Sequence, residues 1–336
     1  MKRYNNLYGS IIDKDNIRLA HKNARKGKTS YTEVKEVDEN IEKYVDILHS
    51  MLNIGTYSPS KYTMFKKNDK GKIREIYKLP YFPDRIVHHA ILQVLEPIWK
   101  KVLVKQTYQS IRGRGVTKCK RDLEKSLGRL NYENTWCVKI DVEKFYPSVD
   151  NSILKVIVAK KIKCYKTLGL LYKIIDSMQG LPIGNYISQY LGNLYLAYMD
   201  HYILSIPSVL TYSRYCDDIV VIVRSKANAK MILNLLNSYL NDKLKLNIKS
   251  NKQYFCITQR GIDYVGFVFT STGVRLRKTI VSKFKKASRA NKDLVMASYY
   301  GWLLECQSVA LWLKYYKGSK KYVRIEESYR FRACEV

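Results

Sequence analysis

The sequence has no long apolar run and no cysteines spaced as zinc ligands. No stretch of about 18 apolar residues occurs, so no segment is expected to span a membrane. The seven cysteines form an odd set, and the polar N-terminus does not resemble a signal peptide, which together favour a reducing cytoplasm. Internal repeats and low-complexity linkers are also absent, so a repeat architecture is not expected.

Acidic residues are scarce beside basic ones. The chain has 29 Asp and Glu against 60 Lys and Arg, a formal net charge of +31. Such an excess repels itself unless a polyanion binds it, and nucleic acid is the commonest polyanion. The basic residues run from end to end with 29 tyrosines between them, which suits phosphate binding and stacking on unpaired bases. A membrane surface, an acidic protein or a ribosome-associated role would also account for the charge alone.

Apolar spacing predicts a folded chain of mixed structure. Hydrophobic residues make up 46% of the 336 residues, enough for two or three packed subdomains. Helices are predicted over residues 15–25, 33–52, 84–102, 152–162, 167–178, 188–203 and 227–244. Strands are predicted over residues 62–65, 73–79, 136–141, 210–223 and 254–269. This order predicts an α+β fold, with a basic, helical C-terminal part after about residue 275.

Two acidic motifs follow apolar strands. Asp217 and Asp218 stand side by side where two strands are expected to turn, and Asp141 ends another strand. Adjacent carboxylates are unfavourable if buried unpaired, and a divalent metal is the usual compensation. A turn exposed to water is the alternative for Asp217 and Asp218 alone. If the strands pair, Asp141 and Asp217 share a site suited to two-metal phosphodiester formation, in which one ion activates a 3′-hydroxyl and the other holds the triphosphate.

These motifs, in their order, resemble those of reverse transcriptases, and the resemblance runs across about residues 50–310. It implies a right-hand polymerase fold with fingers, palm and a small helical thumb. The domains implied are an N-terminal helical extension, fingers with palm, and a basic helical thumb, over residues 1–55, 56–275 and 276–336. The chain would then be an RNA-directed DNA polymerase, a nucleotidyltransferase acting on dNTPs.

The resemblance also implies the catalytic centre. It requires two Mg²⁺ ions, for which Mn²⁺ substitutes, and it makes the three aspartates catalytic. The metal-binding positions implied are Asp141, Val142, Asp217 and Asp218. A lysine able to protonate the leaving pyrophosphate falls at Lys252 or Lys249. We assign Lys252 and leave Lys249 open as the alternative.

In the fingers, the expected hairpin and the helix after it match the family. Arg74, with Lys66 or Lys67, is implied to bind the triphosphate of the incoming nucleotide. Solvated hairpin charge is the alternative for these side chains. His88 and His89 have no carboxylates or cysteines at metal-ligand spacing, so they are expected to pack or contact backbone rather than bind an ion.

In the palm, the resemblance implies further nucleotide contacts. Tyr146, like Val142, lies beneath the incoming nucleotide, and its large side chain would exclude a 2′-hydroxyl and so select dNTP over rNTP. Residues 179–189 resemble the loop and helix start that support template and nucleotide. Gly184 would let the backbone approach the nucleotide closely. Gln189 would help to shape the pocket over the template base, with ordinary helix packing as the alternative.

The subfamily is indicated by residues 183–189 and by Ser-Tyr-Tyr-Gly-Trp at 298–302. Both are similar to the reverse transcriptases of diversity-generating retroelements. That resemblance implies a bacterial or phage-encoded enzyme that copies a template RNA into cDNA with errors opposite adenine. It also implies a small basic accessory protein that forms an oligomer.

Three other hypotheses stay open. A phage-defence reverse transcriptase of the abortive-infection type would share every catalytic residue. A catalytically idle RNA-binding protein on a polymerase scaffold would not need the intact aspartates. A basic scaffold protein would bind nucleic acid without incorporating nucleotides. No carboxylate set or histidine pattern of a nuclease is present, so template degradation is not expected.

Overall fold

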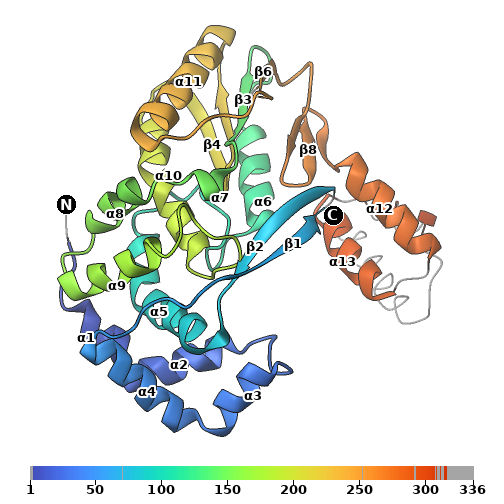
Figure 1. Cartoon of the computed structure of the whole chain (residues 1–336). Helices are drawn as coiled ribbons and strands as arrows, with labels where there is room; N and C mark the ends of the chain where they lie inside the picture. The colour runs from blue at the N-terminus through green and yellow to red at the C-terminus, as the bar shows by residue number, and fades with distance from the viewer. Residues whose placement is uncertain are drawn as a thin grey trace. The chain divides into compact units, whose positions relative to one another are not determined.

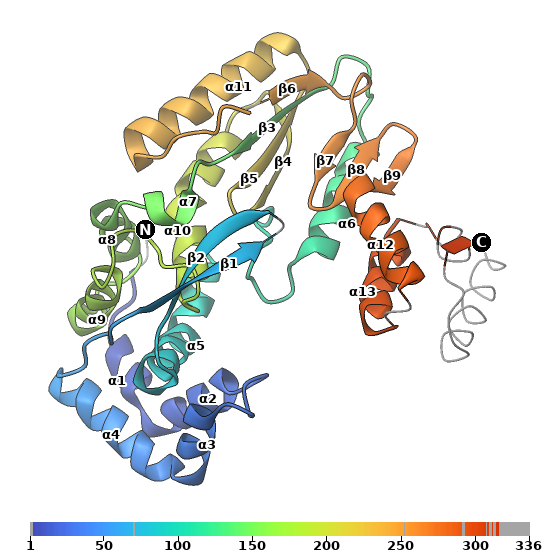
Figure 2. The same ribbon diagram turned by 45° about the vertical axis from the view of Figure 1, so that its right-hand side comes forward.

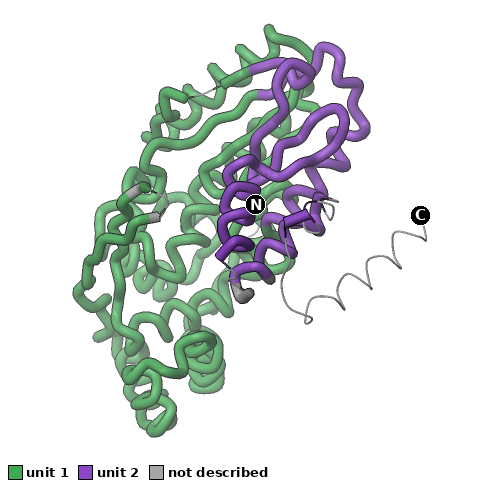
Figure 3. The backbone as a smooth tube through the Cα atoms, turned by 90° about the vertical axis from the view of Figure 1, so that its right-hand side faces the viewer, with its two compact units in different colours: residues 1–115, 138–254 green, residues 116–137, 255–336 purple. Residues whose placement is uncertain are grey.

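The computed structural model describes residues 3–69, 71–251, 253–290, 293–306, 308, 311 and 314–315. The chain forms two compact units, and each is assembled from two separate stretches (Figure 3). Unit 1 comprises Met1–Gly115 and Val138–Tyr254, and unit 2 comprises Val116–Cys137 and Phe255–Val336. The domain boundaries expected after residues 55 and 275 remain predictions.

Unit 1 begins with a cluster of helices. In Figure 1 the N-terminal helices gather around α5 (Ile86–Lys100), and they are α1 (Leu7–Ile12), α2 (Lys14–Ala24), α3 (Thr32–Glu39) and α4 (Ile41–Ile54). The single helix predicted over residues 33–52 is wrong, because Asn40, with φ −130° and ψ 42°, separates α3 from α4.

A separate hairpin follows. Strands β1 (Thr63–Asp69) and β2 (Lys72–Lys78) pair antiparallel as a two-stranded sheet, which Figure 2 shows apart from the larger sheet. The predicted hairpin is therefore confirmed. The short π-helix η1 (Tyr81–Arg85) leads from β2 into α5.

A four-stranded sheet forms the centre of the molecule's larger unit, in the order β4-β5-β3-β6. Its strands are β3 (Trp136–Asp141), β4 (Val209–Tyr215), β5 (Asp218–Val223) and β6 (Gln253–Cys256). The side chains from Ile219 to Val223 are all buried, as expected for a β-branched central strand packed on both faces. Helix α10 (Ser188–Leu204) packs against β4, and α11 (Lys226–Ser238) packs against β5.

Four short helices complete unit 1. They are α7 (Phe145–Ser148), α8 (Asn151–Ala159), α9 (Tyr165–Ile175) and the π-helical η2 (Tyr239–Lys243). Helix α7 follows β3 by three residues, so the aromatic pair Phe145 and Tyr146 starts immediately beyond the acidic end of that strand. Asp150 caps α8 by accepting a hydrogen bond from the backbone N–H of Ile153 at 3.0 Å.

Unit 2 contains helix α6 (Val116–Leu127), a three-stranded antiparallel sheet and two C-terminal helices. The strands are β7 (Ile262–Tyr264), β8 (Phe267–Thr270) and β9 (Gly273–Leu276), and the helices are α12 (Lys278–Arg289) and α13 (Asp293–Leu304). The strand structure predicted over residues 254–269 is present as the separate strands β6, β7 and β8. Gly266, at φ +92°, turns the chain between β7 and β8, and a Cβ there would lie 2.6 Å from the Trp302 ring.

Helix α6 was not predicted, although Cys119, Leu123 and Leu127 mark one buried helical face. Its many lysines and low mean hydropathy hide this pattern. Within the described ranges, no helix combines the length and the apolar character that a bilayer crossing demands.

Candidate active site

The Asp217 motif lies on a tight hairpin turn. Tyr215 pairs with Asp218, so Cys216 and Asp217 are the two turn residues between β4 and β5. Cys216 has φ 60°, in the left-handed region, whereas Asp217 does not have a positive φ. This is the pattern of a type II′ turn, whose first position is usually glycine. A cysteine there carries local strain, which is common at functional sites.

Asp141 and Asp217 come together because β3 and β5 are neighbours in the sheet. Burial raises the pKa of the Asp217 carboxyl above its ordinary value, and the charge of Asp141, which is in hydrogen-bonding contact with it, raises that pKa further. Two carboxylates in such contact favour a shared proton or a bound cation. The structure therefore places these two predicted residues in one site.

Asp218 faces a different neighbour. Its carboxylate lies 3.8 Å from the ammonium of Lys139 on β3. In the part of the chain that the structure describes, no three His, Cys, Asp or Glu side chains are grouped to hold an ion by themselves. Two carboxylates nevertheless fit Mg²⁺, which is commonly bound by one or two carboxylates together with substrate phosphates.

Backbone pairing orients the residue after Asp141. The N–H of Lys249 donates to the carbonyl of Asp141 at 2.9 Å, and the N–H of Glu143 donates to Asn247 at 2.8 Å. Between them, Val142 lies opposite Ile248 in an antiparallel bridge without exchanging hydrogen bonds with it. The Val142 carbonyl therefore points away from Ile248. The role of this oxygen as a metal ligand remains a prediction.

Of the two candidate lysines for the general acid, the structure describes Lys249. The Lys249 ammonium contacts the Asp141 carboxylate at 2.5 Å, and both side chains are about one-third exposed. Lys252 lies outside the described residues, so its assignment remains a prediction. The alternative, Lys249, is the lysine that the structure places beside the acidic pair.

Tyr146 lies against the turn. Its hydroxyl accepts a contact from the Cys216 thiol at 3.7 Å, and burial raises the pKa of that hydroxyl. Burial and the adjacent Asp217 also raise the pKa of the Cys216 thiol to about 12, so the thiol is neutral. The Tyr146 carbonyl accepts a hydrogen bond from Leu181 at 2.8 Å, which fixes the start of the predicted nucleotide loop.

Gly184 is held against the hairpin. The N–H of Tyr77 donates to the carbonyl of Ile183 at 2.8 Å. Gly184 has φ +125°, and a Cβ there would lie 2.7 Å from the Tyr77 carbonyl oxygen. Glycine is therefore required both by its backbone angle and by the close approach of β2.

The hairpin orients its basic residues. Arg74 pairs with Lys67, and Lys66 pairs with Glu75. Directly opposed residues point to the same face of an antiparallel pair, so Lys67 shares the Arg74 face and Lys66 lies on the other. The choice between Lys66 and Lys67 as a triphosphate contact remains a prediction, and the register shows only which of them shares a face with Arg74.

Gln189 borders an open groove of about 900 Å³ in unit 1. Ser110 donates to the Gln189 side-chain oxygen at 2.7 Å, which fixes the amide at the groove. His89 stacks on Tyr186 with ring centroids 4.0 Å apart, and the lining also includes the basic residues Lys26, Lys100, Arg112 and Arg114. Partly exposed tyrosines among basic and amide groups suit a single-stranded nucleic acid.

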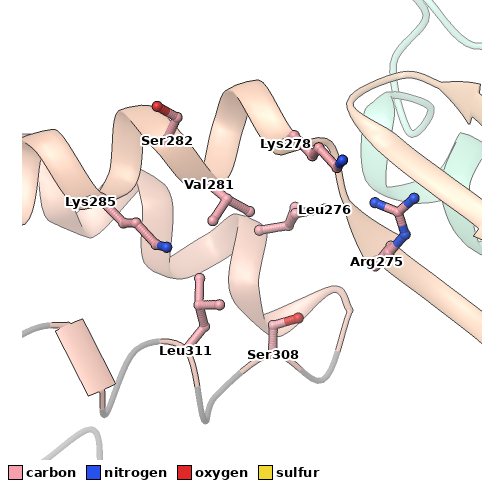
Figure 4. Close-up of a pocket in the computed structure, with 8 residues that line it drawn as sticks. All are labelled: Arg275, Leu276, Lys278, Val281, Ser282, Lys285, Ser308 and Leu311. Atoms are coloured by element: carbon pink, nitrogen blue, oxygen red, sulfur yellow. The ribbon is translucent and has the colours of Figure 1, made fainter.

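Unit 2 has its own basic pocket of about 470 Å³. Figure 4 shows Leu276, Val281 and Leu311 turned toward a common space, with Lys285 at one end and Arg275 at the other. Sequence reasoning identified the basic composition here but not the apolar floor, because that floor joins β9, α12 and a later segment.

The family pattern described as "Reverse transcriptase (RNA-dependent DNA polymerase)" matches residues 65–269, more than half of the chain. The chain therefore belongs to the reverse transcriptase family, whose members are RNA-directed DNA polymerases.

Its relatives include protein YkfC of Escherichia coli strain K12, which is 24% identical over 267 residues that cover 66% of this chain and 70% of YkfC. The group II intron-encoded protein LtrA of Lactococcus lactis is 20% identical, over 88% of this chain and 60% of LtrA. Telomerase from Candida tropicalis, solved with a TWJ fragment of telomeric RNA, has a TM-score of 0.50 and 13% identity, over 72% of this chain and 53% of that one. The expected polymerase fold of fingers, palm and thumb is thus confirmed.

Proposed function

We propose that this chain extends a DNA 3′ end on an RNA template by two-metal nucleotidyl transfer. The observation that carries the proposal is the contact between Asp141 and the buried Asp217 at the end of β3 and the turn before β5. Family membership indicates the class of reaction, and the acidic pair indicates where in the chain that reaction would take place.

Asp141 and Asp217 are the proposed Mg²⁺ ligands, with the Val142 carbonyl and, as predicted, Asp218 beside them. A cation fits because two carboxyl groups are in contact here, and a positive ion beside them would offset the burial and the mutual repulsion that raise the pKa of Asp217. When bound, Mg²⁺ would stabilise the charge that develops on the attacking and leaving oxygens, and Mn²⁺ is expected to substitute.

Other residues of the site would position the substrates. Lys249, in contact with Asp141, is placed to lend a proton to the leaving pyrophosphate. The ring of Tyr146 would occupy the space that a 2′-hydroxyl needs. Arg74 and Lys67, on one face of the hairpin, would bind the triphosphate through charge-assisted hydrogen bonds.

The groove beside Gln189 is the proposed path of the unpaired template RNA. Its basic rim would hold phosphates, and the partly exposed Tyr186, supported from below by the buried His89, would contact bases. Gln189 would contact the base that is being copied, because Ser110 already fixes its amide orientation.

The finer assignment is a diversity-generating enzyme that makes adenine-mutagenised cDNA with a basic oligomeric accessory protein. It is supported by the sequence pattern at residues 183–189 and by an exposed Gln189 at the template groove. A reducing cytoplasm is the proposed location, and the cysteines within the described ranges are free thiols.

The test is primer extension on an adenine-containing RNA with dNTPs and Mg²⁺, followed by sequencing of the cDNA. We expect extension by the wild type and none by Asp141→Asn, with errors clustered opposite adenine. Salt-sensitive RNA binding without extension would contradict the polymerase and favour an idle RNA-binding or scaffold protein. Extension with evenly spread errors would contradict the diversity-generating assignment and favour a defence enzyme.

A further inference from the structure

A buried ion pair lies behind the metal-site turn. Arg214 on β4 and Asp200 on α10 are both fully buried, and the guanidinium Nη2 lies 2.6 Å from the carboxylate. Arg214 Nε also donates to both carboxylate oxygens, at 2.8 and 3.0 Å. Tyr212 and Thr107 donate to the same carboxylate, at 2.5 and 3.2 Å. The carboxylate is thus saturated with donors, and the guanidinium plane is fixed.

The remaining guanidinium nitrogen reaches the turn. Arg214 Nη1 donates to the carbonyl of Cys216 at 3.0 Å and to the Asn193 side-chain oxygen at 3.2 Å. Cys216 is the residue with φ 60°, and its carbonyl belongs to the peptide that enters Asp217. A charged donor from a buried side chain therefore holds the one turn residue whose backbone is strained.

The same cluster holds the loop before the template groove. Arg214 pairs with this loop through its backbone, donating to Gln106 at 2.9 Å and accepting from Tyr108 at 3.1 Å. Asn193 donates to the Gln109 carbonyl at 2.8 Å, one residue before the Ser110 that fixes Gln189. The metal-site turn and the Gln189 contact are thus tied to one buried cluster.

Stability alone does not account for this arrangement. Burying an ion pair removes both charges from water, and well-packed apolar residues of similar volume often serve a core as well or better. An apolar pair could not donate to the Cys216 carbonyl. The charged pair therefore adds a fixed donor beneath the turn that an apolar core would lack.

We propose that Arg214 is a positioning residue of the metal site, which fixes the Cys216 carbonyl and thereby the placement of the Asp217 carboxylate. The proposal rests on the proposed function, because it takes Asp141 and Asp217 to be the metal ligands. Arg214 itself is buried and would touch neither substrate nor ion.

The test measures Mn²⁺ binding to the protein without nucleic acid, from the electron paramagnetic resonance signal of the free ion. The variants are Arg214→Lys and the neutral pair Asp200→Asn/Arg214→Gln, which removes both buried charges together and leaves hydrogen-bonding groups in place. We expect each to weaken Mn²⁺ binding about tenfold, the worth of one charge-assisted hydrogen bond. Tyr212→Phe, which removes a hydrogen bond from the same Asp200 but none from the turn, should stay within about twofold of the wild type.

Primer extension gives the second readout. The Arg214 variants should need more Mg²⁺ for half-maximal rate, and excess Mg²⁺ should restore part of kcat. Wild-type Mn²⁺ binding in a folded Arg214 variant would overturn the proposal. If Arg214→Lys does not fold, Mn²⁺ binding by the Asp200→Asn/Arg214→Gln double variant tests the proposal instead. Loss of Mn²⁺ binding in the variants alongside an inactive wild type would support the positioning role while contradicting the polymerase.

Discussion

At the scale of single residues, the site is a set of side chains fixed by their neighbours. Tyr146 is the clearest case, because its hydroxyl contacts Cys216 and its carbonyl accepts from Leu181. The ring is therefore held between the metal-site turn and the loop that leads to Gly184. A fixed ring can exclude a 2′-hydroxyl by volume, which a mobile one would not do.

Replacing Tyr146 by alanine should relax the choice of sugar. Without the ring, the 2′-hydroxyl of an rNTP has space, so the ratio of kcat/KM for dNTP over rNTP should fall by about 10- to 100-fold. Tyr146→Phe is the matched control, since it keeps the ring and loses only the hydroxyl, and it should retain most of the discrimination. An unchanged ratio in Tyr146→Ala would show that another group selects the sugar.

Local sequence was enough to find Asp141 and Asp217, because each motif carries its own strand and acidic end. It was not enough to place Lys249 or Lys67 relative to their neighbours, or to find Arg214 at all. The first depends on a backbone pairing with β3, the second on the hairpin register, and the third on a helix and a loop far away in the chain. Such pairings bring together residues that no spacing within a motif reveals.

At the scale of elements, helix α5 links the fingers hairpin to the helical cluster, and its histidines are part of the core. His88 and His89 are 2% and 6% exposed, and the expectation that they pack is confirmed. Burial lowers the pKa of His88 to about 3 and that of His89 to about 4, with the nearby Arg85 acting in the same direction. Both are neutral in the folded protein.

The buried histidines predict acid sensitivity. Because their folded pKa values lie below the ordinary 6.5, the unfolded chain takes up protons first as the pH falls. The free energy of unfolding therefore keeps the full contribution of both histidines above pH 6.5. It loses that contribution toward pH 4, at up to about 1.4 kcal/mol per pH unit for each histidine. Urea unfolding from pH 7 to 4.5 should show a shallower loss in His88→Leu than in the wild type. The exposed control His201→Gln should follow the wild type, and equal slopes in His88→Leu and the wild type would contradict this account.

Elements with strong apolar periodicity were predictable, as the match at β3 shows. The break at Asn40 was not, because the flanking residues continue the apolar pattern through it. Helix α6 was missed for the opposite reason. Its lysines interrupt the apolar pattern, so the face that is buried in the structure is hard to recognise in the sequence.

At the scale of the whole molecule, charge and chain topology agree with a polymerase. The net charge of +31 favours binding to a polyanion. Basic residues line both the groove of unit 1 and the pocket of unit 2. The chain leaves unit 1 at Gly115, returns at Val138 through β3, and leaves again after Tyr254 within β6. Two of these three crossings lie within strands of the sheet that carries Asp141, namely β3 and β6. Composition predicted the partner class, but it did not predict this interleaving of the two units.

The most direct test of the central claim is the single-turnover rate of dNTP addition to a primed RNA template, compared between Asp217→Asn and the wild type. Asp176→Asn is the matched control, because Asp176 is an exposed carboxylate paired with Lys155 on the surface. We expect Asp217→Asn to lower the rate by at least about 100-fold, because it removes a carboxylate ligand of the proposed Mg²⁺ ions, which would stabilise the negative charge on the reacting oxygens. Asp176→Asn should leave the rate unchanged. Wild-type rates in Asp217→Asn would contradict the assignment of Asp141 and Asp217 as the catalytic metal site.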